Sequence, residues 1–230
     1  MFPGAFAATM DKISIVAVPV LLAITLHEAA HGLMAKRLGD GTAWALGRVS
    51  LNPFRHIDPI GTVVLPLLLM LTTNFMFGYA KPVPVNFANL RHGRWGVIAV
   101  ALAGPGANLA LIFASIGVIY GLYFNYSAIP EQVGQFVFQV AVASIQINLT
   151  LMVFNLMPLL PLDGGRVLNE LLPRALSRAF ERTEPFGMYI ILGLLLLGAW
   201  PYLMQPPMTF AYHTLVAPLL PGPVNAILMR

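Results

Sequence analysis

The densest group of reactive side chains in this chain is the segment His27-Glu28-Ala29-Ala30-His31. It has the spacing HExxH, which on an α-helix places the two histidines one turn apart on the same face. Two imidazoles in this arrangement can bind one Zn²⁺, and the glutamate is placed to act as a general base on water at the metal. The pattern by itself is only moderately specific, because chance matches also occur on soluble helices.

The HEAAH segment lies at the end of an apolar run that extends from Ile13 to about Ala35. Ionisable groups in such a run are costly unless they face a cavity or a partner. A structural alternative is a ring of polar residues where the helix leaves the bilayer, because Lys36 and Arg37 follow closely. Three ionisable side chains within one short segment favour a functional site over this alternative.

A catalytic zinc site needs a third protein ligand and an open fourth position. The chain has no cysteine, so this ligand must be His, Asp or Glu. Asp163 is the best candidate, because it lies in NLMPLLPLDGG (155–165), where proline and glycine break a helix near a membrane boundary. The remaining acidic and imidazole candidates are Asp11, Asp40, His56, Asp58, His92, Glu131, Glu170, Glu181, Glu184 and His213.

The composition indicates a membrane protein. Of the 230 residues, 58% are hydrophobic and 10% are charged, and the mean hydropathy is +0.77, whereas soluble domains carry about 25% charged residues. The net charge of +4 does not indicate nucleic-acid binding, because the basic residues lie in loops between apolar runs. We expect one membrane-embedded domain over residues 1–230, with a catalytic core at about 13–170 and C-terminal helices at about 186–230. We do not expect the first run to be cleaved as a signal peptide, because it continues into HEAAH without a small-residue cleavage site.

Apolar runs along the chain predict an all-α bundle of about five to six transmembrane helices. The runs are Ile13 to about Ala35, Ile60 to Phe77, Trp95 to Phe124, Gln132 to about Leu160, Phe186 to Leu203 and Phe210 to Met229. Prolines interrupt the last run, so whether residues 205–230 cross the membrane stays open.

The basic residues predict how these runs are arranged. Three loops, 36–58, 78–94 and 161–185, hold eleven of the thirteen Lys and Arg residues. Basic loops favour the cytoplasmic side, and all three can lie there only if the run from Ile60 to Phe77 enters the membrane and returns. The proposed ligands require the same arrangement, because HEAAH and Asp163 can meet only if residues 36–94 begin and end on one side. We therefore predict a re-entrant segment and an active site toward the cytoplasm.

Four motifs in this order resemble the site-2 protease family of intramembrane metalloproteases, which is M50-type. The motifs are HEAAH, FGYAKPVPVN (77–86), GPGAN (104–108) and FNLMPLLPLDGG (154–165). The resemblance covers roughly residues 15–170 and implies one zinc ion held by His27, His31 and Asp163, with Glu28 as catalytic base and later proton donor. It also implies that Asn108 and Asn155 hold substrate backbone or the oxyanion, for which interhelical hydrogen bonding is the alternative. Gly104 and Gly106 are then expected to serve close helix packing.

The resemblance implies hydrolysis of peptide bonds in or near the transmembrane segments of other membrane proteins. The protein would be a multi-pass protein of a prokaryotic cell membrane, whose partners are the lipid bilayer and a transmembrane substrate. Residues 78–87 would add an edge strand to the unwound substrate, and the fold could include a short β-hairpin.

Two other functions stay open at this point. A membrane zinc protease of the prenyl-protein type also uses HExxH but takes a glutamate as third ligand, for which Glu170, Glu181 and Glu184 are candidates. A non-enzymatic metal-binding or transport protein would need the histidines without a general base.

The polar residues of LNPFRHIDP form a further cluster outside these motifs. His56 and Asp58 could act near the site or as gating groups. The simpler interpretation is a turn, since Asn-Pro and Asp-Pro both favour turns.

Overall fold

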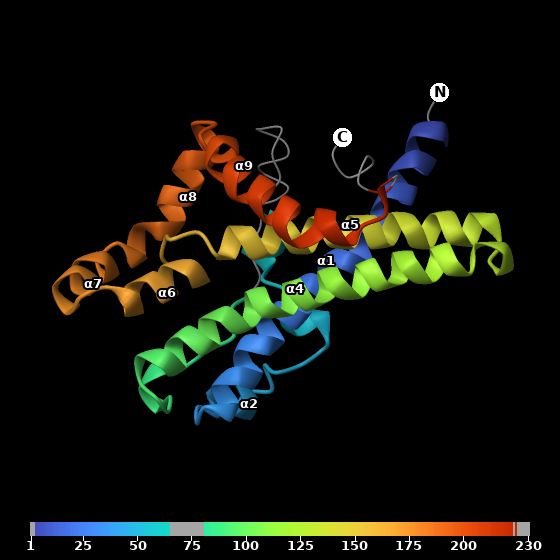
Figure 1. Ribbon diagram of the computed structural model, residues 1–230. Helices are drawn as coiled ribbons and strands as arrows, with labels where there is room; N and C mark the ends of the chain where they lie inside the picture. Colours follow the sequence, from blue (N-terminus) through green and yellow to red (C-terminus); the bar gives the residue numbers. More distant parts are fainter. Residues whose placement is uncertain (1–2, 65–80, 223, 225–230) are drawn as a thin grey trace.

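The computed structural model describes residues 3–64, 81–222 and 224, and within this part the chain is helical and has no strand (Figure 1). Three long helices form its centre: α1 (Pro3–Arg37), α4 (Arg94–Phe124) and α5 (Glu131–Asn155). Each contains a stretch long and apolar enough to cross a membrane, namely Ile13–Arg37, Arg94–Phe124 and Glu131–Asn155.

Shorter helices surround this centre. They are α2 (Thr42–Ala45), α6 (Asp163–Leu171), α7 (Arg174–Glu181), α8 (Gly187–Leu196) and α9 (Trp200–Ala211). Single 3₁₀ turns occur at Pro53–Arg55, Phe87–Asn89, Tyr126–Ala128, Glu184–Phe186 and Ala217–Leu219, and π-helical turns at Pro59–Val64 and Tyr212–Val216.

The expected number of five to six spans is too high for the described part of the chain. Three helices qualify as spans, or four if the bent pair Arg174–Leu196 and Trp200–Leu219 counts as one, with an angle of 96° between its halves. The apolar run from Phe186 to Leu203 breaks at Gly198, which has φ +68°. The amide of Gly198 donates to Leu195 O and that of Ala199 to Leu194 O, so a left-handed glycine ends α8 before α9 begins. Hydropathy alone does not register such a break.

The connection between α1 and α4 begins and ends at the same end of the molecule. The amide of Arg91 donates to the carbonyl of Leu38 over 2.7 Å, so the start of α4 lies beside the end of α1. This agrees with the prediction that residues 36–94 begin and end on the same side. The run from Ile60 to Phe77 falls mostly outside the described residues, and its re-entrant path stays a prediction. The β-hairpin is not found in the described part, where residues 81–86 are extended without forming a strand.

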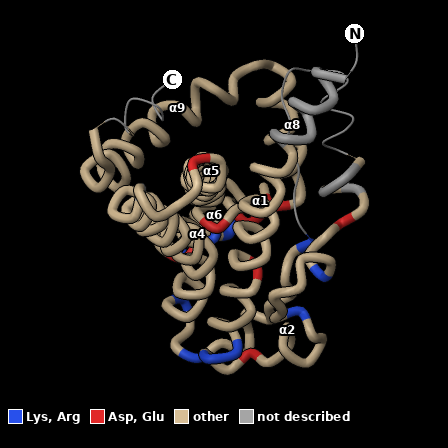
Figure 2. The backbone as a smooth tube through the Cα atoms, turned by 90° about the vertical axis from the view of Figure 1, so that its right-hand side faces the viewer, with Lys and Arg blue, Asp and Glu red and all other residues tan. Residues whose placement is uncertain are grey.

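The core lies between α4 and α5 and is closed by α9. Ile112 of α4 and Ile145 of α5 are fully buried, and Trp200 and Met204 of α9 cover the same cluster. Figure 2 looks onto the α4–α5 turn and shows Lys and Arg away from it, mainly toward α2.

Candidate metal centre

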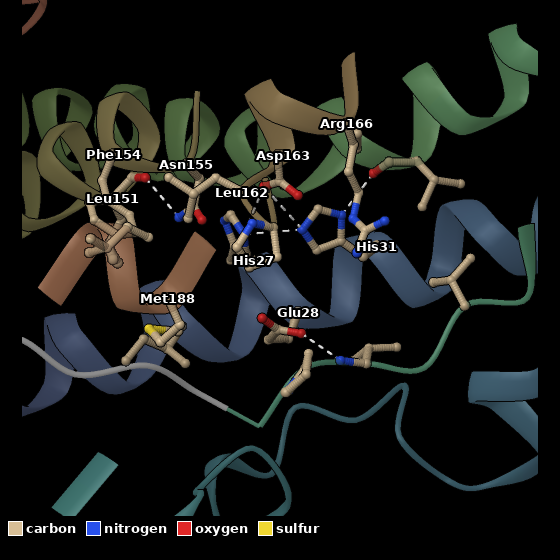
Figure 3. Close-up of a pocket in the computed structure, with 18 of the residues that line it drawn as sticks. His27, Glu28, His31, Leu151, Phe154, Asn155, Leu162, Asp163, Arg166 and Met188 are labelled. Atoms are coloured by element: carbon tan, nitrogen blue, oxygen red, sulfur yellow. Dashed lines mark hydrogen bonds and ion pairs between the residues drawn. The ribbon is translucent and has the colours of Figure 1, made fainter. Parts of the chain in front are cut away.

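Three side chains from two distant segments meet at one point in the structure (Figure 3). His27 Nε2 and His31 Nε2 are 3.1 Å apart, and Asp163 Oδ2 lies 3.3 Å and 3.5 Å from them. The three ligating atoms lie within 4.8 Å of one another, and no other group of His, Asp or Glu in the described chain has this arrangement. Asp163 Oδ2 is buried and has no hydrogen-bond donor. Three such donor atoms converging in a buried place fit a metal ion with tetrahedral preferences.

His27 and His31 lie one turn apart on helix α1, and residues of α4 contact the Nδ1 atom of each ring. His31 Nδ1 lies 2.7 Å from the carbonyl oxygen of Val100, and His27 Nδ1 lies 2.6 Å from Asn108 Oδ1. Contacts of this kind fix the orientation of a ligating imidazole and direct the other ring nitrogen at the metal.

Gly104 permits this close approach of α4. A Cβ at this position would collide with His31 Nε2 and His27 Nε2. The close packing expected at this glycine is therefore packing against the two histidines.

Asp163 is the first residue of α6 and reaches the histidines because the chain reverses after α5. Residues 156–162 form a turn, and α6 packs back upon it. A Cβ at Gly164 or Gly165 would collide with the backbone of Leu156 or Leu159, so the glycine pair of the LDGG motif allows the reversal. The break in the helix expected from the prolines and glycines is present at this place.

The carboxylate of Glu28 faces the extended segment 81–86. Its Oε2 accepts a hydrogen bond from the amide of Val83 over 2.8 Å. Glu28, the three ligating side chains and Asn155 line a cavity of about 680 Å³, which Arg166 also borders (Figure 3). The cavity therefore lies directly against the three ligating side chains and Glu28.

Asn108 and Asn155 have different surroundings. Asn155 lines the cavity, although its amide nitrogen is bonded to Leu151 O at 2.9 Å. Asn108 is fully buried behind His27, outside the cavity lining, and bonds to His27 and Asn148. Its place agrees with interhelical hydrogen bonding rather than with direct contact to substrate.

Asp40 holds the segment that contacts Glu28. Its carboxylate is fully buried and accepts hydrogen bonds from the amide of Asn86 at 2.8 Å, the side chain of Asn89 at 3.2 Å, and Thr42. Arg48 supports the other end of the segment by donating to Lys81 O at 2.8 Å. Asp40 therefore ties the end of α1 to the backbone that contacts Glu28.

Replacing Asp40 by asparagine should destabilise the protein in a pH-dependent way. Burial raises the pKa of Asp40, but the hydrogen bonds from Thr42, Asn86 and Asn89 outweigh it, so the pKa lies below its ordinary 3.8. A lowered folded-state pKa stabilises the fold above the unfolded-state value, and this contribution is lost as the pH falls through the folded-state pKa. The difference in thermal midpoint between wild type and Asp40→Asn should be largest near pH 7 and shrink below about pH 4. A difference that stays constant over this range would contradict it.

The remaining polar candidates lie elsewhere. Asn52 accepts the amide of Phe54, and Asp58 accepts that of Gly61, as in turns; His56 Nε2 contacts Ser50 O. Among the alternative third ligands, Glu181 accepts from Asn169 and Glu184 pairs with Arg166.

Three partners of the centre could not be recognised from the sequence: Val83, Val100 and Asn148. The first two act through backbone atoms, which any residue type supplies. Asn148 lies in an apolar run, where a lone asparagine gives a weak signal.

Comparison with known proteins gives a consistent family. The sequence model of peptidase family M50 matches residues 128–198, a range that includes Asp163 but not HEAAH. A protein of Bacillus subtilis (strain 168), named "Putative zinc metalloprotease YwhC", is 34% identical over 194 residues, which cover 82% of this chain and 83% of that protein. "Putative zinc metalloprotease Rip2" of Mycolicibacterium smegmatis is 29% identical over 181 residues, 78% of this chain and 65% of that protein. No solved structure matches the chain significantly.

The extent of the likeness to the Bacillus subtilis protein goes well beyond a short motif, and the family-model match contains the reversal that carries Asp163. The chain therefore belongs to peptidase family M50, the site-2 protease family, as its ordered motifs predicted.

Proposed function

We propose that this chain is an intramembrane zinc protease of the site-2 type, which hydrolyses peptide bonds in or near the transmembrane segments of other membrane proteins. One observation carries the proposal: His27, His31 and Asp163 converge beside Glu28. The two histidines and Glu28 lie on an apolar helix, and Asp163 contacts the histidines from another segment. Membership of the M50 family and the names of the relatives support the protease activity and the use of zinc.

His27, His31 and Asp163 would hold a single zinc ion. Zinc would supply Lewis-acid activation of water and of the scissile carbonyl. The chain's own contribution to proton transfer is Glu28, whose carboxylate lines the cavity next to the ligands. Glu28 takes the proton from the attacking water and passes it to the leaving amine.

The cavity supports binding of an extended peptide. The backbone of residues 82–85 borders one side of the cavity, and apolar side chains such as Leu151, Phe154 and Met188 border another. Extended backbone can pair with an unwound substrate through main-chain hydrogen bonds, and Asn155 is available to a substrate carbonyl. A transmembrane segment that unwinds locally supplies both the free backbone groups and the apolar side chains.

The basic loops support a cytoplasmic position for the active site. Ala45, at the end of α2, and Ala88, in the turn Phe87–Asn89, are exposed and lie in the basic stretches 36–58 and 78–94, whereas Ser127 lies in the α4–α5 turn, which has no Lys or Arg. Because the chain has no native cysteine, single cysteines at these positions can be labelled without background. In intact cells, Ser127→Cys should react with an impermeant maleimide, and Ala45→Cys and Ala88→Cys only after lysis. Labelling of Ala45→Cys and Ala88→Cys from opposite sides would contradict this topology.

The direct test of the function is cleavage of a single-span membrane protein by the purified chain in detergent or liposomes. Wild type and Glu28→Gln are compared with the same substrate, and the zinc content of each sample is measured beside it.

A further inference from the structure

A chain of buried polar side chains leads away from the metal centre into the bundle. His27 Nδ1 contacts Asn108 Oδ1 at 2.6 Å, and Asn108 Nδ2 donates to Asn148 Oδ1 at 2.9 Å. Asn148 Nδ2 in turn donates to the backbone carbonyl of Ser144 at 2.8 Å. Asn108 and Asn148 are both fully buried, and the chain passes from α1 through α4 to α5.

The backbone carbonyl at the end of this chain determines the direction of every hydrogen bond in it. A carbonyl oxygen can only accept, so Asn148 must present its amide nitrogen to Ser144 and its oxygen to Asn108. Asn108 must then present its nitrogen to Asn148 and its oxygen to His27. The carbonyl of Ala23 lies 3.5 Å from Asn108 Nδ2 and favours the same orientation.

The orientation of Asn108 decides where His27 carries its proton. An imidazole nitrogen that faces an amide oxygen is a donor, so Nδ1 of His27 is protonated. In a neutral imidazole the other nitrogen then has a free lone pair, and that nitrogen, Nε2, is the atom directed at Asp163 and His31. His31 reaches the same state directly, because its Nδ1 faces the carbonyl of Val100.

The opposite orientation of Asn108 would disable His27 as a ligand. With its nitrogen facing Nδ1, Asn108 would stabilise the tautomer whose proton lies on Nε2. That proton would point into the group of ligating atoms, and His27 could not bind a metal until it moved.

We propose that Asn148 is a positioning residue that fixes the amide orientation of Asn108 and thereby keeps Nε2 of His27 free to bind zinc. The inference rests on the proposed function, because it takes His27 as a ligand. Asn148 is separated from His27 by Asn108 and acts only through it.

A double-mutant experiment separates this role from simple packing. Asn148→Leu removes the acceptor that orients Asn108 and should weaken zinc binding about tenfold or more, as loss of a partner behind a ligating histidine typically does. Asn108→Asp replaces the amide by a carboxylate, which can only accept from Nδ1 of His27. In the Asn108→Asp background position 108 has no amide to orient, so the added Asn148→Leu should cause no further loss of zinc affinity, a coupling that independent sites do not show.

Zinc affinity is measured on the purified full chain by competition with a chelator. Equal losses in the two backgrounds, or no loss in the wild-type background, would overturn the proposal. Gln146→Leu is the matched control, because Gln146 is on the same helix but exposed, and it should leave zinc affinity unchanged.

A further variant covers the case in which Asn148→Leu does not fold. Asn148→Asp keeps an oxygen facing Asn108 Nδ2 in either protonation state and should bind zinc within about twofold of wild type. A loss as large as that of Asn108→Leu, measured in parallel, would also overturn the proposal. If the wild-type chain itself binds no zinc, the proposed function fails instead, so the two failures are distinguishable.

Discussion

Replacing Glu28 by glutamine should abolish cleavage of a transmembrane substrate while leaving the zinc content of the protein unchanged. Loss of a positioned general base typically costs about 10²- to 10⁴-fold in rate. The amide of glutamine cannot take a proton from water, but its oxygen can still accept from the amide of Val83, which the Glu28 carboxylate does at 2.8 Å. The change therefore removes proton transfer and preserves the shape of the site.

Two measurements show whether the loss of cleavage is due to the missing base and not to loss of zinc or of the fold. Metal analysis of purified Glu28→Gln should give the same zinc per chain as wild type, because Glu28 is outside the ligand set of His27, His31 and Asp163. Glu131→Gln is the matched control: this exposed carboxylate lies at the start of α5, in the turn opposite the site, and the variant should cleave normally. Cleavage by Glu28→Gln at the wild-type rate would eliminate the protease mechanism and favour a metal-binding or transport role.

Replacing Asp163 by alanine should remove both zinc and activity. The two histidines on α1 would remain, but with only two protein ligands the site falls below the three that catalytic zinc sites use. Asp163 Oδ2 has no hydrogen-bond donor and lies 3.3 Å and 3.5 Å from the histidine nitrogens, and among the described residues no other carboxylate forms a ligand cluster with the two histidines. We expect the loss of zinc affinity to exceed the 10- to 100-fold typical of a partner behind a ligand.

The matched control for Asp163→Ala is Glu184→Ala. Glu184 is the candidate third ligand of the prenyl-protein type, and in the structure it pairs with Arg166 over 2.9 Å. If Asp163→Ala kept its zinc and Glu184→Ala lost it, the third ligand would be Glu184 and not Asp163. Thermal unfolding of both variants in detergent shows whether a loss of zinc reflects the ligand or the fold.

The ligand types and their local spacing could be predicted from the sequence because they depend on one helix. His27 and His31 share a face of α1 through the helical period alone. The proline- and glycine-rich segment before Asp163 predicted a break in the helix, and the structure has a turn there. The charges of the loops predict that this turn lies on the cytoplasmic side. In the described part of the chain the structure has fewer spans than the apolar runs predict, because hydropathy depends only on composition, whereas the left-handed turn at Gly198 decides where the run from Phe186 to Leu203 bends.

By itself, then, the sequence indicated the family and the membrane setting, and it predicted His27, His31 and Asp163 as ligands and Glu28 as the base. Only the tertiary structure decided that Asp163 rather than a later glutamate reaches the histidines, and that Asn108 lies behind His27 instead of facing the cavity. It alone also brought Val83 to Glu28 and Asn148 to Asn108. The physical reason is that these contacts join residues from 40 to 136 positions apart, and contacts of that range depend on how α1, α4, α5 and α6 pack, which no local pattern encodes.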